Sequence, residues 1–274
     1  MHYFPDSATA RTLPTEELRS RFLLSRLFEP GKIALNVTDL DRLVVGGAVP
    51  LGETLRLEPP SGLAAEYFTQ RRELGALNIG GSGTITVDGK AYAMAKRDVL
   101  YVGKGARDVR LASDDPAAPA RYYLVSYPAQ VSHPTSLVTA KEAHSTELGS
   151  ADKANRRRIS RYIHADGVKS GQLVMGVTVL ESGSVWNTMP AHTHSRRTEV
   201  YMYFDLPPDA VVVHLMGEPD ETRSIIVRDG EAVLSPAWSI HCGCGTSSYS
   251  FCWAMGGENQ DYADMDPVDM KLLR

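Results

Sequence analysis

Alternation of apolar and polar residues, the pattern typical of half-buried β-strands, recurs along most of the chain. Asp88-Gly89 lies between two such runs and predicts a type I′ hairpin, and Asp229-Gly230 predicts a second hairpin. Short strands separated by turn residues at this density predict an all-β sandwich or barrel. The predicted strands are 77–79, 84–87, 90–92, 98–102, 121–125, 172–180, 200–204, 210–216, 224–227 and 249–255.

Signals for helices are few. Thr15 is a candidate N-cap, and apolar residues at helical spacing follow it, which predicts a helix over 15–28. A final helical turn is predicted near Met270.

The two halves of the chain share an order of features that predicts a duplicated β-domain. Arg71-Arg72-Glu73 precedes the first hairpin, and Arg196-Arg197-Thr198-Glu199 precedes the strands of the second half. We expect an N-terminal domain over 1–135, a polar, strand-poor linker over 136–158, and a C-terminal domain over 159–274. The first half lacks histidines at the matching places, so a metal ion is expected in the C-terminal domain only.

One group of residues carries the ligand types that a divalent metal prefers. Residues two apart on a strand point to the same face, so His192 and His194 can hold one ion together. Glu199 follows a short polar break and begins an aromatic, β-favouring run, from which it can fold back onto the same site. With a further histidine downstream, the predicted metal ligands are His192, His194, Glu199 and His241.

Composition and charge narrow the class of protein. The net charge of −4 shows no basic excess, so nucleic acid is not an expected partner. No apolar run approaches the roughly 20 residues of a membrane span, and the first residues lack the pattern of a secretory signal. Three clustered cysteines do not resemble a disulfide framework and suit a reducing compartment. Cys242 and Cys244 could be soft metal ligands, but strand alternation places both opposite His241, which favours small buried hydrophobes.

The spacing of the predicted ligands resembles the two motifs of the cupin superfamily. His192-x-His194-x4-Glu199 matches the first motif, and the stretch from Gly230 through Pro236 to His241 matches the second. The resemblance implies jelly-roll β-barrels with the three histidines and the glutamate inside one of them.

A closer resemblance extends along nearly the whole chain. Residues 71–89, 101–106, 186–190, 192–194 and 257–260 are similar to the 5-keto-4-deoxyuronate isomerase family, also called 4-deoxy-L-threo-5-hexosulose-uronate ketol-isomerases. This implies a bicupin, a duplicated cupin with few short helices, and one Zn²⁺ per chain on the four predicted ligands. It also implies a small keto-uronate substrate from pectin, an aldose-ketose isomerisation, a cytoplasmic location and assembly into homo-hexamers.

The implied reaction moves a proton between neighbouring carbons, which needs a base within hydrogen-bond reach of that proton. The sequence does not rank the candidates and leaves the catalytic residues unknown. Arg196 and Arg197 could bind the substrate carboxylate or lie on a solvated turn, so neither is included among the site residues. The candidate bases are Glu258, Tyr249, Tyr201, Tyr203 and an unligated oxygen of Glu199.

Three other functions fit the same ligand set. The first is the related 5-deoxyglucuronate isomerase of inositol catabolism, with the same reaction type on another substrate. The second is an iron-dependent cupin dioxygenase, which would consume oxygen. The third is a non-catalytic sugar-binding or regulatory cupin.

Overall fold

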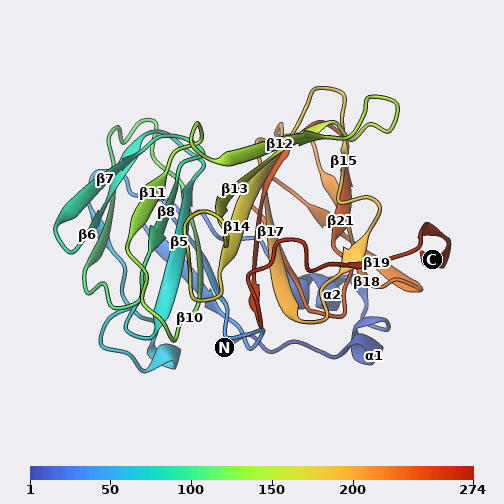
Figure 1. The fold of residues 1–274 in the computed structure, drawn as a ribbon, viewed down its shortest axis with the longest axis horizontal. Helices are drawn as coiled ribbons and strands as arrows, with labels where there is room; N and C mark the ends of the chain where they lie inside the picture. Colours follow the sequence, from blue (N-terminus) through green and yellow to red (C-terminus); the bar gives the residue numbers. More distant parts are fainter. The chain divides into compact units, whose positions relative to one another are not determined.

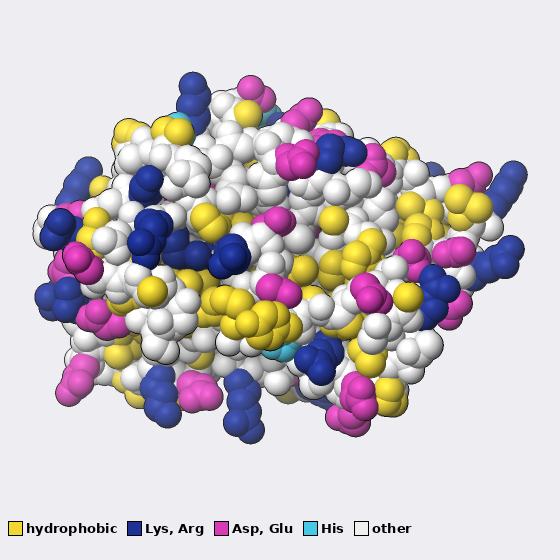
Figure 2. All heavy atoms as spheres, turned by 90° about the horizontal axis from the view of Figure 1, so that it is seen from below, with side chains coloured by type: hydrophobic (Ala, Val, Ile, Leu, Met, Phe, Trp, Pro, Cys, Tyr) yellow, Lys and Arg dark blue, Asp and Glu magenta, His cyan; other side chains and the backbone are white.

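Two compact units make up the structure, a computed structural model that describes residues 1–274 (Figure 1). The first unit comprises residues 1–2, 26–144 and 162–175, and the second comprises 3–25, 145–161 and 176–274. No helix is long and apolar enough to cross a membrane. Figure 2 shows side chains of both charge signs on the face that it presents. The division of the chain at residues 135 and 159 stays a prediction.

The first unit is built from two antiparallel sheets. One has six strands in the order β11-β8-β5-β10-β3-β2, and the other has four in the order β4-β9-β6-β7. Buried Leu74 and Leu124 of the larger sheet share one core with Ile85 and Leu111 of the smaller sheet, so the sheets pack face to face. The elements are β2 (Ile33–Val37), β3 (Val44–Ala48), β4 (Leu55–Arg56), η1 (Ser61–Leu63), β5 (Arg72–Asn78), β6 (Gly83–Val87), β7 (Lys90–Met94), β8 (Val99–Val102), β9 (Val109–Ser113), β10 (Tyr122–Pro128) and β11 (Ser136–Val138).

The hairpin predicted at Asp88-Gly89 is confirmed. Val87 of β6 pairs with Lys90 of β7, so the loop has two residues. Asp88 and Gly89 have φ angles of 47° and 84°, as a type I′ turn requires at both central positions.

A buried carboxylate organises one part of the first unit. Glu73 of β5 accepts hydrogen bonds from the backbone N–H groups of Gln172 and Leu173, both at 2.8 Å, and from the Tyr101 hydroxyl at 2.8 Å. These donors offset the cost of burying the charge. Arg72 beside it is also buried and donates to the carbonyl of Ser126 at 2.8 Å.

The second unit has a larger sheet of seven strands in the order β1-β20-β17-β22-β14-β13-β12. A four-stranded sheet, β15-β21-β18-β19, and the pair β16-β23 complete it. Its elements are α1 (Ser7–Ala10), α2 (Thr15–Phe22), β1 (Leu23–Leu24), β12 (His144–Leu148), β13 (Arg157–Ile163), β14 (Val174–Leu180), β15 (Trp186–Asn187), β16 (His192–Thr193), β17 (Arg197–Phe204), β18 (Val212–Glu218), β19 (Glu221–Val227), β20 (Ala232–Ser235), β21 (Cys242–Gly245), β22 (Ser250–Gly257), β23 (Asp266–Pro267) and η2 (Met270–Leu272).

Aromatic side chains fill the space between the two main sheets of the second unit. Tyr203 of β17 and Phe251 of β22 come from the seven-stranded sheet, and the hydroxyl of Tyr203 lies 2.7 Å from Nδ1 of His214 on β18 of the four-stranded sheet. The two sheets therefore face each other. His214 is fully buried, and burial lowers its pKa to about 3, so it is a neutral core residue.

Three local predictions were wrong. The helix over 15–28 ends at Phe22, because Leu23 and Leu24 pair with β20 and this strand pairing overrides the helical spacing. Asp229-Gly230 does not close a hairpin, since β19 and β20 lie in different sheets and the turn carries the chain from one to the other. Residues 136–158 were expected to be poor in strands, but they contain β11, all of β12 and the start of β13.

Candidate metal centre

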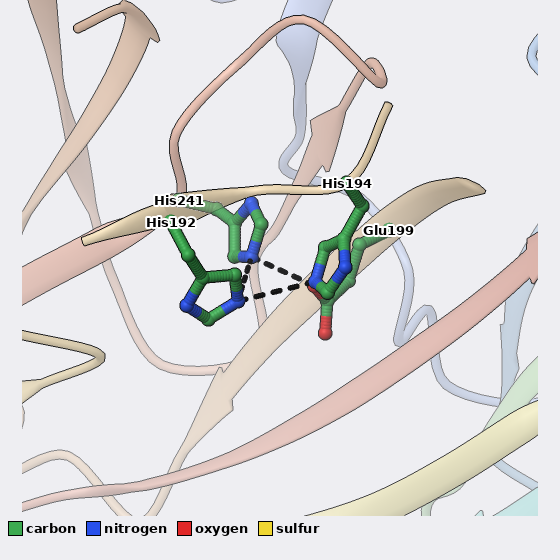
Figure 3. A group of neighbouring side chains, drawn as sticks. All are labelled: His192, His194, Glu199 and His241. Carbon is green, nitrogen blue, oxygen red and sulfur yellow. Dashed lines mark hydrogen bonds and ion pairs between the residues drawn. The ribbon is translucent and has the colours of Figure 1, made fainter. Parts of the chain in front are cut away.

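The four predicted ligands converge in the second unit (Figure 3). Nε2 of His192 lies 3.1 Å from Nε2 of His194 and 3.1 Å from Nε2 of His241. Oε2 of Glu199 lies 3.0 Å from Nε2 of His194 and 2.8 Å from Nε2 of His241. All four ligand atoms lie within 4.8 Å of one another.

Strand geometry brings these side chains together. His192 belongs to the short strand β16 and pairs with Pro267 of β23, so His194 two residues later returns to the same face. Glu199 lies within β17, between Ser235 of β20 and Met255 of β22. His241 directly precedes β21. The prediction that Glu199 folds back toward the two histidines from a following strand is confirmed.

The hydrogen bonds behind two of the imidazoles fix which nitrogen carries the proton. Nδ1 of His194 lies 2.8 Å from the carbonyl oxygen of Asp264, which can only accept, and 3.3 Å from Nη2 of Arg197, which can only donate; the shorter contact assigns the proton to Nδ1. Nδ1 of His241 faces the Ser235 hydroxyl at 3.2 Å and the Ser239 carbonyl at 3.4 Å. When the ring is neutral, Nε2 therefore presents a bare lone pair to the cluster, the arrangement that metal-ligating histidines show.

Burial and mutual contact shift the pKa values of the cluster. Burial, together with the neighbouring His241, lowers the pKa of His192 to about 3. Burial alone would lower the pKa of His194, but contact with the carboxylate of Glu199 raises it. Burial alone would raise the pKa of Glu199, but the adjoining His241 and His194 hold it below its usual range. The carboxylate thus stays ionised, and it attracts a cation.

A single proton cannot satisfy this arrangement. It would bridge only one of the four contacts of 2.8–3.1 Å. Oε2 of Glu199 receives no hydrogen bond although two imidazole nitrogens lie beside it. A metal ion would accept all four lone pairs at once, so the donor set fits a divalent cation.

The arginines that precede Glu199 hold a C-terminal segment, residues 258–267, against the site. Nη1 and Nη2 of Arg197 donate to the carbonyls of Asp261 and Asp264, both at 2.6 Å. Asp264 is also the residue whose carbonyl orients His194. Arg196 pairs with the carboxylates of Asp264 and Asp266. Both guanidinium groups are therefore engaged within the chain, and sequence reasoning had left their role open.

The cysteines take no part in the cluster. Cys242 is buried in a small apolar group with Ala191 and Ile240, and burial raises the pKa of its thiol to about 12. It is a neutral, packed side chain, as strand alternation predicted.

A pocket of about 280 Å³ opens on the cluster. Of the five candidate bases, only Glu199 and Tyr201 line it. Tyr249 and Tyr203 are engaged elsewhere, with Asn187 and His214, and Glu258 is exposed. Sequence reasoning did not single out Arg157, which also lines this pocket. The remaining walls are mainly apolar, from Leu148, Ile159, Met189, Pro190, Phe251, Trp253, Met255 and Met265.

The fold and the site together define a class: two antiparallel β-sandwich units, with three imidazoles and one carboxylate inside the second, make a bicupin. Residues 26–271 match the KduI/IolB family. A 4-deoxy-L-threo-5-hexosulose-uronate ketol-isomerase of Caldicellulosiruptor bescii is 53% identical over 96% of both chains. One of Opitutus terrae is 53% identical over 100% of this chain and 99% of its own. The chain belongs to the KduI/IolB family.

Solved structures share the fold at low sequence identity. An IolB-like protein from Salmonella typhimurium has a TM-score of 0.75 at 14% identity and covers 90% of this chain and 96% of its own. An oxalate decarboxylase of Bacillus subtilis has a TM-score of 0.56 at 12% identity, covering 82% and 71%. At these identities the likeness concerns the fold alone.

We predict that Arg197→Met lowers the free energy of unfolding by about 2 kcal/mol, because methionine cannot replace the two hydrogen bonds that this buried guanidinium donates to the carbonyls of Asp261 and Asp264. The matched control is Arg196→Met, which removes exposed ion pairs and should cost much less. Urea denaturation measures both. Equal losses in the two variants would contradict the role assigned to Arg197.

Proposed function

We propose that this protein is a metal-dependent aldose-ketose isomerase. Its substrate is 4-deoxy-L-threo-5-hexosulose uronate, also called 5-dehydro-4-deoxy-D-glucuronate, and its product is 3-deoxy-D-glycero-2,5-hexodiulosonate. The observation that carries this proposal is the 53% identity, along nearly the full length, to proteins named as ketol-isomerases of this uronate. The cluster of three histidines and one glutamate at the wall of a sugar-sized pocket supports it.

We propose Zn²⁺ as the metal, one ion per chain, held by His192, His194, Glu199 and His241. The bare Nε2 atoms of His194 and His241 and the ionised carboxylate support this assignment. Zinc has no redox chemistry, which suits an isomerisation, and the family resemblance favours it over iron, manganese or nickel, which accept the same donors.

The reaction moves hydrogen within the substrate and needs no oxidant. A proton leaves C2 and another is delivered to C1, while the hydroxyl proton on O2 is lost and O1 gains one. The aldehyde end thus becomes a hydroxymethyl group and C2 becomes a ketone. A divalent cation bound at the cluster supplies Lewis-acid polarisation of the substrate's carbonyl group.

We propose that Tyr201, with Thr188 beside it, moves a proton between the two substrate oxygens. The Tyr201 hydroxyl lies 2.9 Å from Oγ1 of Thr188, and both residues line the pocket. Burial and the nearby charge of Glu199 raise the pKa of Tyr201, so its hydroxyl stays protonated. A neutral hydroxyl can donate to one oxygen while it accepts from the other, and this is the role that we propose for Tyr201.

The cellular setting belongs to the same proposal. We place the reaction in the cytoplasmic breakdown of pectin-derived uronates by a homo-hexamer, with the metal in the C-terminal cupin domain. Three unpaired cysteines suit a reducing compartment. The sequence resemblance supports the hexamer, and light scattering of the purified protein would measure its mass.

Purified protein incubated with 4-deoxy-L-threo-5-hexosulose uronate should yield the ketose, identified by proton NMR. The same assay with 5-deoxyglucuronate separates the two sugar isomerases. An oxygen electrode separates both from a dioxygenase. Oxygen consumption, or turnover of 5-deoxyglucuronate alone, would overturn the proposal.

We predict that His194→Ala loses the bound metal, at least tenfold in affinity, and turnover together, since one of four ligands is removed. Elemental analysis and the NMR assay measure the two losses, and circular dichroism should show an unchanged β-fold. His144→Ala, at an exposed histidine at the start of β12, is the control. An active variant depleted of metal would contradict the assignment.

We predict that Tyr201→Phe lowers kcat by about 100-fold, the usual contribution of one acid-base group. Metal content should be unchanged, because the hydroxyl contacts Thr188 and is not a ligand. Steady-state kinetics with elemental analysis check this. Wild-type kcat in the variant would exclude the proton relay.

A further inference from the structure

Three consecutive arginines, residues 156–158, enter β13 of the second unit, and only the outer two have acidic partners. Arg156 pairs with Glu181 at 3.2 Å, and Arg158 pairs with Glu147 at 2.9 Å. Both pairs are exposed. Arg157 between them has no carboxylate partner, and it lines the pocket that opens on the metal cluster.

The guanidinium of Arg157 keeps most of its hydrogen-bonding capacity. It donates from Nη1 to the carbonyl of Asn155 at 2.8 Å, one of its five N–H groups. The ionisable groups that act on it are the neutral hydroxyls of Tyr201, Tyr249 and Tyr262. Burial lowers the pKa of Arg157, which means that its charge is poorly solvated where it stands.

Three other charged groups near the pocket already have partners within the chain. Arg196 and Arg197 are bound to residues of the C-terminal segment. The carboxylate of Glu199 faces the imidazoles. Among the pocket-lining residues, Arg157 is therefore the one permanent cation without a counter-charge, in a cavity whose other walls are mainly apolar.

We propose that Arg157 binds the carboxylate of the sugar acid and selects it over neutral sugars. The proposal rests on the isomerase function and adds the residue that recognises the acid. A planar guanidinium pairs with a carboxylate through two parallel hydrogen bonds, and an anionic ligand offsets the cost of burying the arginine. The acid end of the substrate then lies at Arg157, and the aldehyde end lies at the histidine-glutamate cluster.

The test compares Arg157→Met, Arg157→Lys and the control Arg156→Met on two substrates. One is the keto-uronate, and the other is its neutral analogue with a hydroxymethyl group in place of the carboxylate. For Arg157→Met we expect kcat/KM on the uronate to fall about 100-fold, mainly through a higher KM, and the preference over the neutral analogue to collapse. Arg157→Lys should recover part of the lost kcat/KM, since lysine keeps the positive charge but cannot form the two parallel hydrogen bonds of a guanidinium.

A second readout does not depend on turnover. Binding of D-galacturonate, a non-reacting acid, should weaken by a similar factor in Arg157→Met while the metal content and the melting temperature stay at wild-type values. The Arg156→Met control should match wild type in every measurement. If Arg157→Met does not fold, Arg157→Lys decides: an unchanged preference for the acid in that variant overturns the proposal.

Wild-type protein that does not turn over the keto-uronate would refute the isomerase function itself. Wild-type turnover with an unchanged KM and an unchanged preference in a folded Arg157 variant would refute the carboxylate site alone.

Discussion

The second unit depends on one electrostatic constraint: the carboxylate of Glu199 and three imidazoles are held in contact in its interior. Glu199, His194 and His241 are each at most 3% exposed, so water cannot separate their lone pairs. An uncompensated buried charge costs several kcal/mol. The arrangement becomes favourable when a divalent cation shares the lone pairs, and folding and metal binding are then coupled. The sandwich of two sheets is the rigid frame that keeps the four groups at this distance.

Support for that cluster comes from the chain's C-terminal end. The carbonyl of Asp264 fixes the tautomer of His194, and buried Arg197 fixes the carbonyls of Asp261 and Asp264. The pocket then has the histidine-glutamate cluster at one place, a pair of hydroxyls from Tyr201 and Thr188, and the guanidinium of Arg157 on its wall. A short keto-acid can meet all three, which links the geometry to a reaction at the aldehyde end of an acidic sugar.

The features predicted correctly from the sequence follow from short-range rules. Strand alternation places His192 and His194 on one face, and Asp88-Gly89 fits the φ angles of its turn. The errors came from long-range competition. The helix ends at Phe22 because the next two residues pair with β20. At Asp229-Gly230 the chain crosses from one sheet to the other, and this depends on which strands β19 and β20 pair with. Arg157 could not be told from its neighbours, because the acids that engage Arg156 and Arg158, which are Glu181 and Glu147 respectively, lie in other segments of the chain. The contact of His194 with the carbonyl of Asp264 could not be predicted either, because the two residues are distant in the sequence.

Two arginines followed by a glutamate occur in both halves of the sequence, but the two glutamates have different partners in the structure. In the first unit Glu73 accepts backbone N–H groups and a tyrosine hydroxyl, whereas in the second Glu199 faces imidazoles. The most direct test of the account is an anomalous-scattering map of zinc-loaded crystals. We predict one peak per chain at about 2.0–2.2 Å from the three Nε2 atoms and a carboxylate oxygen of Glu199. A peak elsewhere, or a ligand ring turned away from the ion, would contradict it.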